Sequence, residues 1–146
     1  KELAALRIGD VYDAEGAVRS QFTLSKSQTK GSRARTVFVN KQLTQQLAVY
    51  RKWRCCSDSN APLFRSQKGG HFSANTMCQL FLEIYKACGF KDASSHSGRR
   101  TYITRLANKG VGVRLLAELA GHSHISTTQR YIDVHDDMKR NAVELV

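Results

Sequence analysis

Long apolar runs are missing from this sequence. No stretch reaches the roughly 18 consecutive apolar residues that a membrane-spanning helix needs. The start of the chain does not have the pattern of a signal peptide either. We therefore expect a cytoplasmic protein with no membrane partner.

Metal-binding cysteine patterns are missing as well. The four cysteines form no Cys-x-x-Cys pair, and no pair of histidines lies near them in the sequence. They are Cys55, Cys56, Cys78 and Cys88. We predict reduced thiols that mostly fill the core, with neither a metal site nor a cofactor.

Acidic residues are few compared with basic ones. The 12 Asp and Glu face 23 Lys and Arg, which gives a formal net charge of +11 at pH 7. Such an excess on a small domain is typical of a nucleic-acid-binding surface, although a merely soluble basic protein would have the same balance. A hydrophobic content of 41% argues against a disordered chain. The length of 146 residues suits one domain with a modest core.

Alternating and helical patterns divide the chain. Residues 18–25 and 35–39 alternate apolar with polar side chains and predict two antiparallel strands joined by a basic tip, residues 26–33. Helices are expected in residues 1–9, 40–54 and 73–89, from His96 to Gly110, around Leu115–Leu119, from Ser126 past Tyr131, and around Met138–Leu145. The sequence therefore predicts a mainly helical α+β domain with a small antiparallel sheet on one side.

Local signals predict where several of these helices begin. Asn40, Ser73 and either Ser94 or Ser95 are expected as N-caps. Ser126 with Gln129 fits a capping box, which would place Tyr131 about one turn into its helix. The apolar stripe of the helix from 40 to 54, which includes Trp53, is expected to face the core rather than to stack on bases.

Four side chains between positions 96 and 131 carry chemistry that suits a phosphodiester. Arg99 can hold a phosphate oxygen in a bidentate fork and stabilise the charge of a transition state. Tyr131 can attack phosphorus and form a covalent ester, and His96 and His122 can donate to the phosphate or move protons near neutral pH. His96 and Arg99 are three residues apart, a spacing that predicts one shared helix face.

Each of these residues also has an ordinary structural explanation. A single histidine in a helical protein is more often a hydrogen-bonding partner within the fold, and a single tyrosine is more often a packing residue. Residues 113–131 also fit a helix-turn-helix, so a DNA-binding transcriptional regulator without catalysis is an alternative. Such a regulator would not need His96 and Arg99 one helix upstream. The joint arrangement therefore favours catalysis.

The order and spacing of these motifs resemble the tyrosine recombinase (phage integrase) family. The matching elements are His96-x-x-Arg99, Gly121-His122 and a Ser-Thr-Thr-x-x-Tyr run that ends at Tyr131. The resemblance implies a site-specific recombinase that cuts and rejoins double-stranded DNA through a 3′-phosphotyrosyl intermediate, without a metal. A type IB topoisomerase uses related chemistry, but the Gly-His and Ser-Thr-Thr context favours the recombinase.

The resemblance also assigns roles to residues of the basic tip. Lys30 matches the family's hairpin lysine, a general acid for the leaving 5′ oxygen, with Lys26 as the fallback. The implied catalytic set is Tyr131, Arg99, His96, His122 and Lys30, and the implied DNA-binding set is Lys26, Arg33, Arg100 and Arg130.

The same resemblance implies that residues 1–146 are a fragment of a longer protein. The family's first catalytic arginine would fall just before Lys1, so this chain alone is expected to cleave DNA weakly or not at all. An N-terminal core-binding domain would precede it. The last helix, residues 136–146, is expected either to lie on its own domain or to dock into a neighbouring subunit of a tetramer on DNA. The expected location is the cytoplasm, in association with the nucleoid.

Overall fold

A computed structural model of the chain describes residues 1–29, 33–132 and 136–145. These residues form two compact units, Lys1–Glu83 and Ile84–Val146. Helix α4 (Ala74–Ala87) includes the boundary between them. The described parts are mainly helical with one two-stranded sheet, which confirms the predicted fold class.

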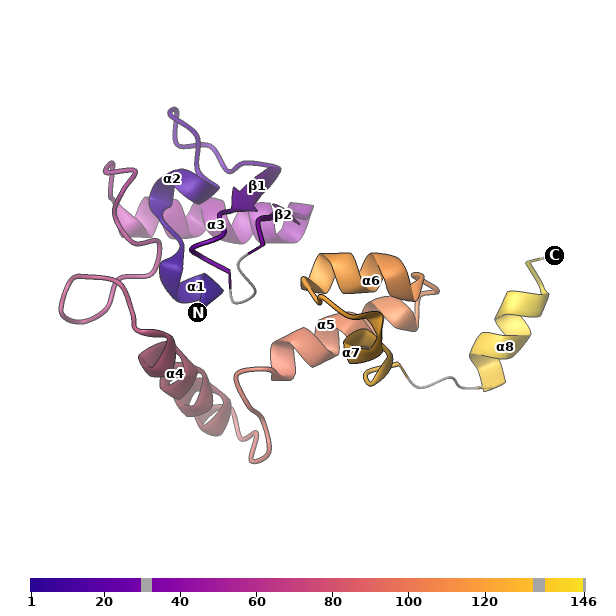
Figure 1. Cartoon of the computed structure of the whole chain (residues 1–146). Coiled ribbons are helices and arrows are strands. Elements are labelled where there is room, and N and C mark those ends of the chain that lie inside the picture. Colours follow the sequence, from indigo (N-terminus) through magenta and orange to yellow (C-terminus); the bar gives the residue numbers. More distant parts are fainter. Residues whose placement is uncertain (30–32, 133–135, 146) are drawn as a thin grey trace. The chain divides into compact units, whose positions relative to one another are not determined.

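The first unit contains the sheet and three of the helices (Figure 1). Its elements are α1 (Glu2–Ala5), α2 (Ile8–Val11), β1 (Gln21–Leu24), β2 (Arg35–Phe38) and α3 (Lys41–Arg54). The strands pair antiparallel as predicted, with Gln21 opposite Phe38. The single helix predicted at residues 1–9 is wrong. Leu6 interrupts it in an extended conformation, and its carbonyl accepts a hydrogen bond from the Leu63 amide at 2.8 Å.

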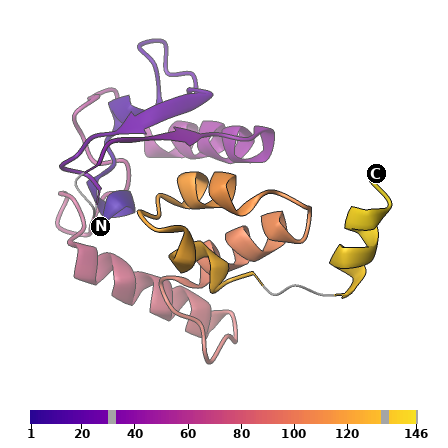
Figure 2. The same cartoon turned by 45° about the vertical axis from the view of Figure 1, so that its right-hand side comes forward.

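Helix α3 runs alongside the β1–β2 hairpin (Figure 2). Asn40 is its N-cap, as predicted, and the Asn40 side chain accepts from the Leu43 amide at 2.8 Å. The buried cluster beneath it consists of Leu6, Ile8, Val11, Tyr12, Leu24 and Leu63. The prediction that Trp53 faces the core is wrong, since its side chain is 77% exposed.

Helix α4 begins in the first unit, where Ser73 caps it, as predicted, by accepting from the Thr76 amide at 3.0 Å. The second unit contains four further helices and a buried cluster of its own. The next elements are α5 (Ser97–Ala107), α6 (Val113–Ala120), α7 (Ile125–Gln129) and α8 (Asp136–Val143). The buried cluster of this unit comes from α5 and α6 and consists of Ile103, Ala107, Leu116 and Ala120. None of the helices in the described parts of the chain is long and apolar enough to cross a membrane.

Candidate active site

Arg99 joins two helices of the second unit. It lies in the first turn of α5, and its Nη1 donates to the Ala120 carbonyl at the end of α6, at 3.0 Å. The last carbonyls of a helix have no partner within the helix and carry partial negative charge, so a guanidinium is a favourable partner for them. The guanidinium is therefore held at the C-terminal end of α6.

His122 follows directly on that end. Gly121 terminates α6 in the left-handed region at φ 69°, and the His122 amide donates back to the Ala117 carbonyl at 2.9 Å. The ring Nδ1 lies 2.8 Å from the Thr128 hydroxyl. Burial lowers the pKa of the His122 imidazole, and the charge of Arg99 lowers it further. A neutral imidazole is therefore expected at pH 7.

Tyr131 lies beside this imidazole, with the two ring centroids 6.2 Å apart. Its half-buried side chain packs against the Ile103–Leu116 cluster. Its carbonyl accepts from the Thr104 hydroxyl at 3.1 Å. The Arg100 guanidinium carbon lies 5.9 Å from the centroid of the phenol ring, within the range of a cation–π contact. Tyr131 is thus tied to α5 through its backbone and its ring.

The predicted position of Tyr131 within a helix is wrong. Helix α7 begins at Ile125 with His124 as its N-cap, rather than at Ser126 with a capping box. The helix ends at Gln129, and Tyr131 lies in the turn that follows it. His124 has an extended backbone, φ −128° and ψ 132°, so the helical turn starts one residue after it. The tyrosine therefore stands outside the helix, where a short turn carries it.

His96 is itself the N-cap residue of α5, and it is exposed. The predicted caps, Ser94 and Ser95, precede it. The Ser94 hydroxyl accepts from the His96 amide at 3.3 Å, and the Ser94 amide donates to Ser97 Oγ at 2.8 Å. This local turn occupies the Ser94 hydroxyl before the helix begins. His96 therefore lies at the start of α5 with a helical backbone, and its carbonyl accepts from the Arg100 amide at 3.0 Å.

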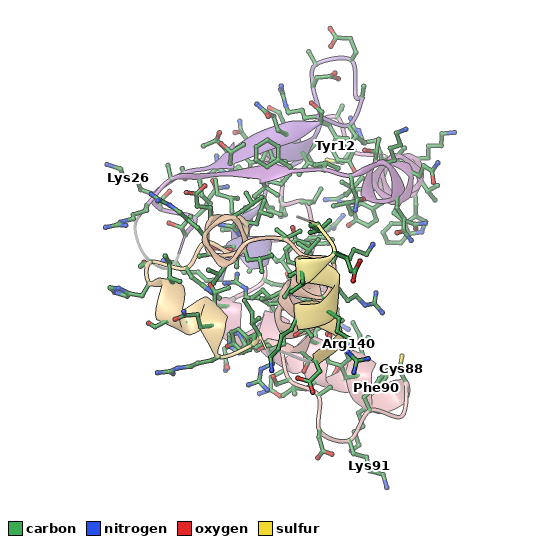
Figure 3. The ribbon with its side chains drawn as sticks, turned by 90° about the vertical axis from the view of Figure 1, so that its right-hand side faces the viewer. Tyr12, Lys26, Cys88, Phe90, Lys91 and Arg140 are labelled. Atoms are coloured by element: carbon green, nitrogen blue, oxygen red, sulfur yellow. The ribbon has the colours of Figure 1, made fainter. Side chains whose placement is uncertain are left out.

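The basic residues of the hairpin belong to the first unit. Lys30 lies outside the described residues. Lys26 is exposed and extends away from the turn after β1 (Figure 3), and Arg33 is also exposed. In the second unit, Arg130 is the exposed C-cap of α7. Within the described residues, no three His, Cys, Asp or Glu side chains are grouped as metal ligands would be.

Thr104 and Thr128 are site residues that the sequence did not reveal. Thr128 lies in the Ser-Thr-Thr run, but nothing in the run distinguishes this threonine from its neighbours. Thr104 bonds a carbonyl 27 positions away, and no local pattern signals such a contact. Helix α7 has only five residues, which is short for a helix that reads a major groove. That length disfavours the helix-turn-helix alternative.

Comparison with known proteins gives a consistent result across nearly the whole chain. Residues 1–138 match the Phage integrase family. The chain is 28% identical over 137 residues to the tyrosine recombinase XerC of Pelobacter propionicus, covering 93% of this chain and 43% of that protein. It is 32% identical over 143 residues to a tyrosine recombinase of Pseudothermotoga lettingae, covering 97% and 47%. The chain thus spans less than half the length of these relatives.

Solved structures resemble the fold over almost the full chain. The crystal structure of XerA recombinase matches with a TM-score of 0.76 at 25% identity, over 99% of this chain and 51% of that one. The Tn1549 transposon integrase in complex with a circular intermediate DNA matches with a TM-score of 0.70 at 26% identity, over 99% and 53%.

Proposed function

Because the chain belongs to the phage integrase family, we propose that it is the catalytic domain of a tyrosine recombinase that cleaves and rejoins double-stranded DNA. One observation carries the proposal. Arg99, His122 and Tyr131 lie around the junction of α5, α6 and the turn after α7, joined by the Arg99–Ala120 bond and the 6.2 Å ring contact. A guanidinium, a neutral imidazole and a phenol in one place suit attack on a phosphodiester.

Cleavage begins when the Tyr131 oxygen attacks the scissile phosphorus. A phenol has a pKa of about 10 in water, so its proton must leave as the bond forms. His96, exposed at the start of α5, accepts that proton. The new P–O bond links the 3′ phosphate to Tyr131, and the bond to the 5′ oxygen breaks.

The remaining residues act on the charge and on the leaving group. Arg99 and His122 donate to the non-bridging oxygens of the pentacoordinate phosphorus. Lys30 protonates the departing 5′ oxygen. The 5′ hydroxyl of a partner strand then attacks the phosphotyrosine, so the energy of the phosphodiester is kept and no energy-rich cofactor is consumed.

DNA binding and assembly complete the proposal. Lys26, Arg33, Arg100 and Arg130 contact the phosphate backbone, which agrees with the net charge of +11. Residues 136–146 dock into a neighbouring subunit of a tetramer on DNA. A DNA-clamping domain precedes this one in the full-length protein, which acts on nucleoid DNA in the cytoplasm.

A suicide substrate tests this function. A nicked duplex loses the strand end that would reverse cleavage, so the covalent adduct accumulates and can be counted on a denaturing gel. The full-length protein should form the adduct, and Tyr131→Phe should bind the same DNA without forming it. Tyr102→Phe, which alters a 46%-exposed tyrosine on α5, is the matched control and should keep the adduct. An adduct formed by Tyr131→Phe would refute the assignment.

A further inference from the structure

The Thr128 hydroxyl and the His122 imidazole form a pair inside the second unit. Thr128 has 0% of its surface exposed, and its Oγ1 lies 2.8 Å from His122 Nδ1. Threonines in helices often donate instead to the carbonyl four residues earlier, as Thr44 does to Asn40 at 3.0 Å. Within residues 1–29, 33–132 and 136–145, the imidazole nitrogen is the hydroxyl's one hydrogen-bond partner.

This burial fixes the direction of the bond. A hydroxyl proton that is buried needs an acceptor, because it has given up its bond to water. If His122 Nδ1 carried a proton and donated it, the Thr128 proton would be left without an acceptor. Thr128 must therefore donate, and Nδ1 must be the unprotonated nitrogen. A neutral imidazole has one N–H, which then resides on Nε2.

We propose that Thr128 is a positioning residue that fixes His122 as the tautomer with its proton on Nε2, so that the ring presents a donor to the scissile phosphate. The inference rests on the proposed function, in which His122 stabilises the developing negative charge. Without the hydroxyl, the neutral ring could hold its proton on either nitrogen. The wrong tautomer turns a lone pair toward an anion, and that arrangement repels.

The backbone of Thr128 adds a second link to the nucleophile. Its carbonyl accepts from the Tyr131 amide at 3.0 Å, while its side chain faces His122. One residue thus sets both the direction of the imidazole and the start of the turn that carries the phenol. A shift of Thr128 would move the donor and the nucleophile together.

Nitrogen NMR of the histidine side chains tests the tautomer directly in this chain without DNA. Loss of a signal in His122→Gln assigns the resonance. We expect wild-type His122 to have an unprotonated Nδ1, and Thr128→Ser to preserve that state. Thr128→Val, which has nearly the same shape but no hydroxyl, should give a mixture of tautomers or the opposite one. Thr127→Val, one position earlier, is the control and should match the wild type.

The wild-type spectrum by itself tests whether Nδ1 of His122 is unprotonated, even if Thr128→Val does not fold. A proton on Nδ1 in the wild type overturns the proposal, and so does an unchanged tautomer in a folded Thr128→Val.

Adduct formation by the full-length protein tests the consequence for the reaction. Loss of the residue that orients a metal-bound histidine commonly lowers metal affinity or activity by about 10–100-fold. We expect a similar loss in the rate of adduct formation for Thr128→Val, and recovery of that rate in Thr128→Ser. A Thr128→Val rate equal to that of the wild type would overturn the positioning role. Absence of any adduct in the wild type would instead refute the proposed function, since the NMR result stands apart from cleavage.

Discussion

Replacing Gly121 by alanine should disturb the site through the backbone alone. Gly121 ends α6 at φ 69° and ψ 33°, a left-handed conformation. A residue with a Cβ pays about 1–2 kcal/mol to adopt it. The chain can avoid that strain by unwinding the end of α6, which would displace the Ala120 carbonyl that holds Arg99 at 3.0 Å. A hydrogen bond from a charged donor contributes about 1.5–3 kcal/mol.

Two measurements separate the stability effect from the effect on the site. The free energy of unfolding of the second unit should fall by about 1–2 kcal/mol, read from amide exchange at the buried Ile103 and Leu116. Fluorescence is unsuitable, since the single tryptophan, Trp53, belongs to the first unit. The rate of adduct formation should fall by about 10–100-fold, because a misplaced Arg99 loses the energy of that hydrogen bond.

Gly110→Ala is the matched control. Gly110 also has a left-handed backbone, at φ 82°, and a Cβ there would meet no atom within 4 Å. Gly110 follows the end of α5, and its amide donates to the Ala107 carbonyl at 2.9 Å. Gly110→Ala should lower the free energy of unfolding by about as much as Gly121→Ala does, and it should leave the rate of adduct formation by the folded protein unchanged. Equal losses of rate in the two variants would show that the turn at Gly121 has no specific role in placing Arg99.

Further predictions concern the charge at the site and the fold that carries it. Arg99→Ala should raise the pKa of His122, because the guanidinium charge lowers that pKa. The same variant should slow adduct formation by about 10²–10³-fold. A His122 titration that NMR finds unchanged in Arg99→Ala would contradict the placement of Arg99 near His122. Because folding lowers the pKa of His122, the unfolded chain binds the proton at a higher pH than the folded chain does. The free energy of unfolding should therefore have its full value above a pH of about 6.5 and decline as the pH falls through that value. His122→Gln should remove this part of the pH dependence, and His124→Gln, at an exposed N-cap, should not; curves of the same shape for His122→Gln and the wild type would refute the assignment. Asn40→Ala should lower the stability of the first unit by about 1 kcal/mol in denaturant titrations followed by Trp53 fluorescence, because it removes the acceptor of the Leu43 amide, whereas Asn40→Asp should keep most of it.

The sequence predicted the helix starts that depend on local chemistry. Asn40 and Ser73 cap α3 and α4 because each side-chain oxygen accepts a hydrogen bond from the amide three residues later. Such a cap depends on no residue from elsewhere in the chain. The strand pair was likewise evident from alternation, and its antiparallel pairing is confirmed.

Predictions failed where tertiary contacts override local signals. Ser126 and Gln129 have the sequence pattern of a capping box, but in the structure both lie inside α7. Thr128 of the same helix faces inward and contacts His122. Trp53 fits the apolar stripe of α3, but the α3 side chains that pack against the small buried cluster of the first unit are Leu47 and Tyr50, and Trp53 is 77% exposed. The meeting of Arg99 with Ala120 depends on how α5 and α6 pack, which periodicity cannot specify.

The two buried clusters share no residue, and this separation divides the proposed chemistry. The phenol, guanidinium and imidazole of the proposed site belong to the unit built on one cluster, while Lys30, which lies outside the described residues, belongs by sequence to the unit built on the other. Partial-loss alleles should therefore fall into two genetic classes. A substrate whose leaving group departs without a proton, such as a 5′-bridging sulfur, should restore cutting to alleles that loosen the hairpin. The same substrate should do nothing for alleles that loosen the helices around Ile103.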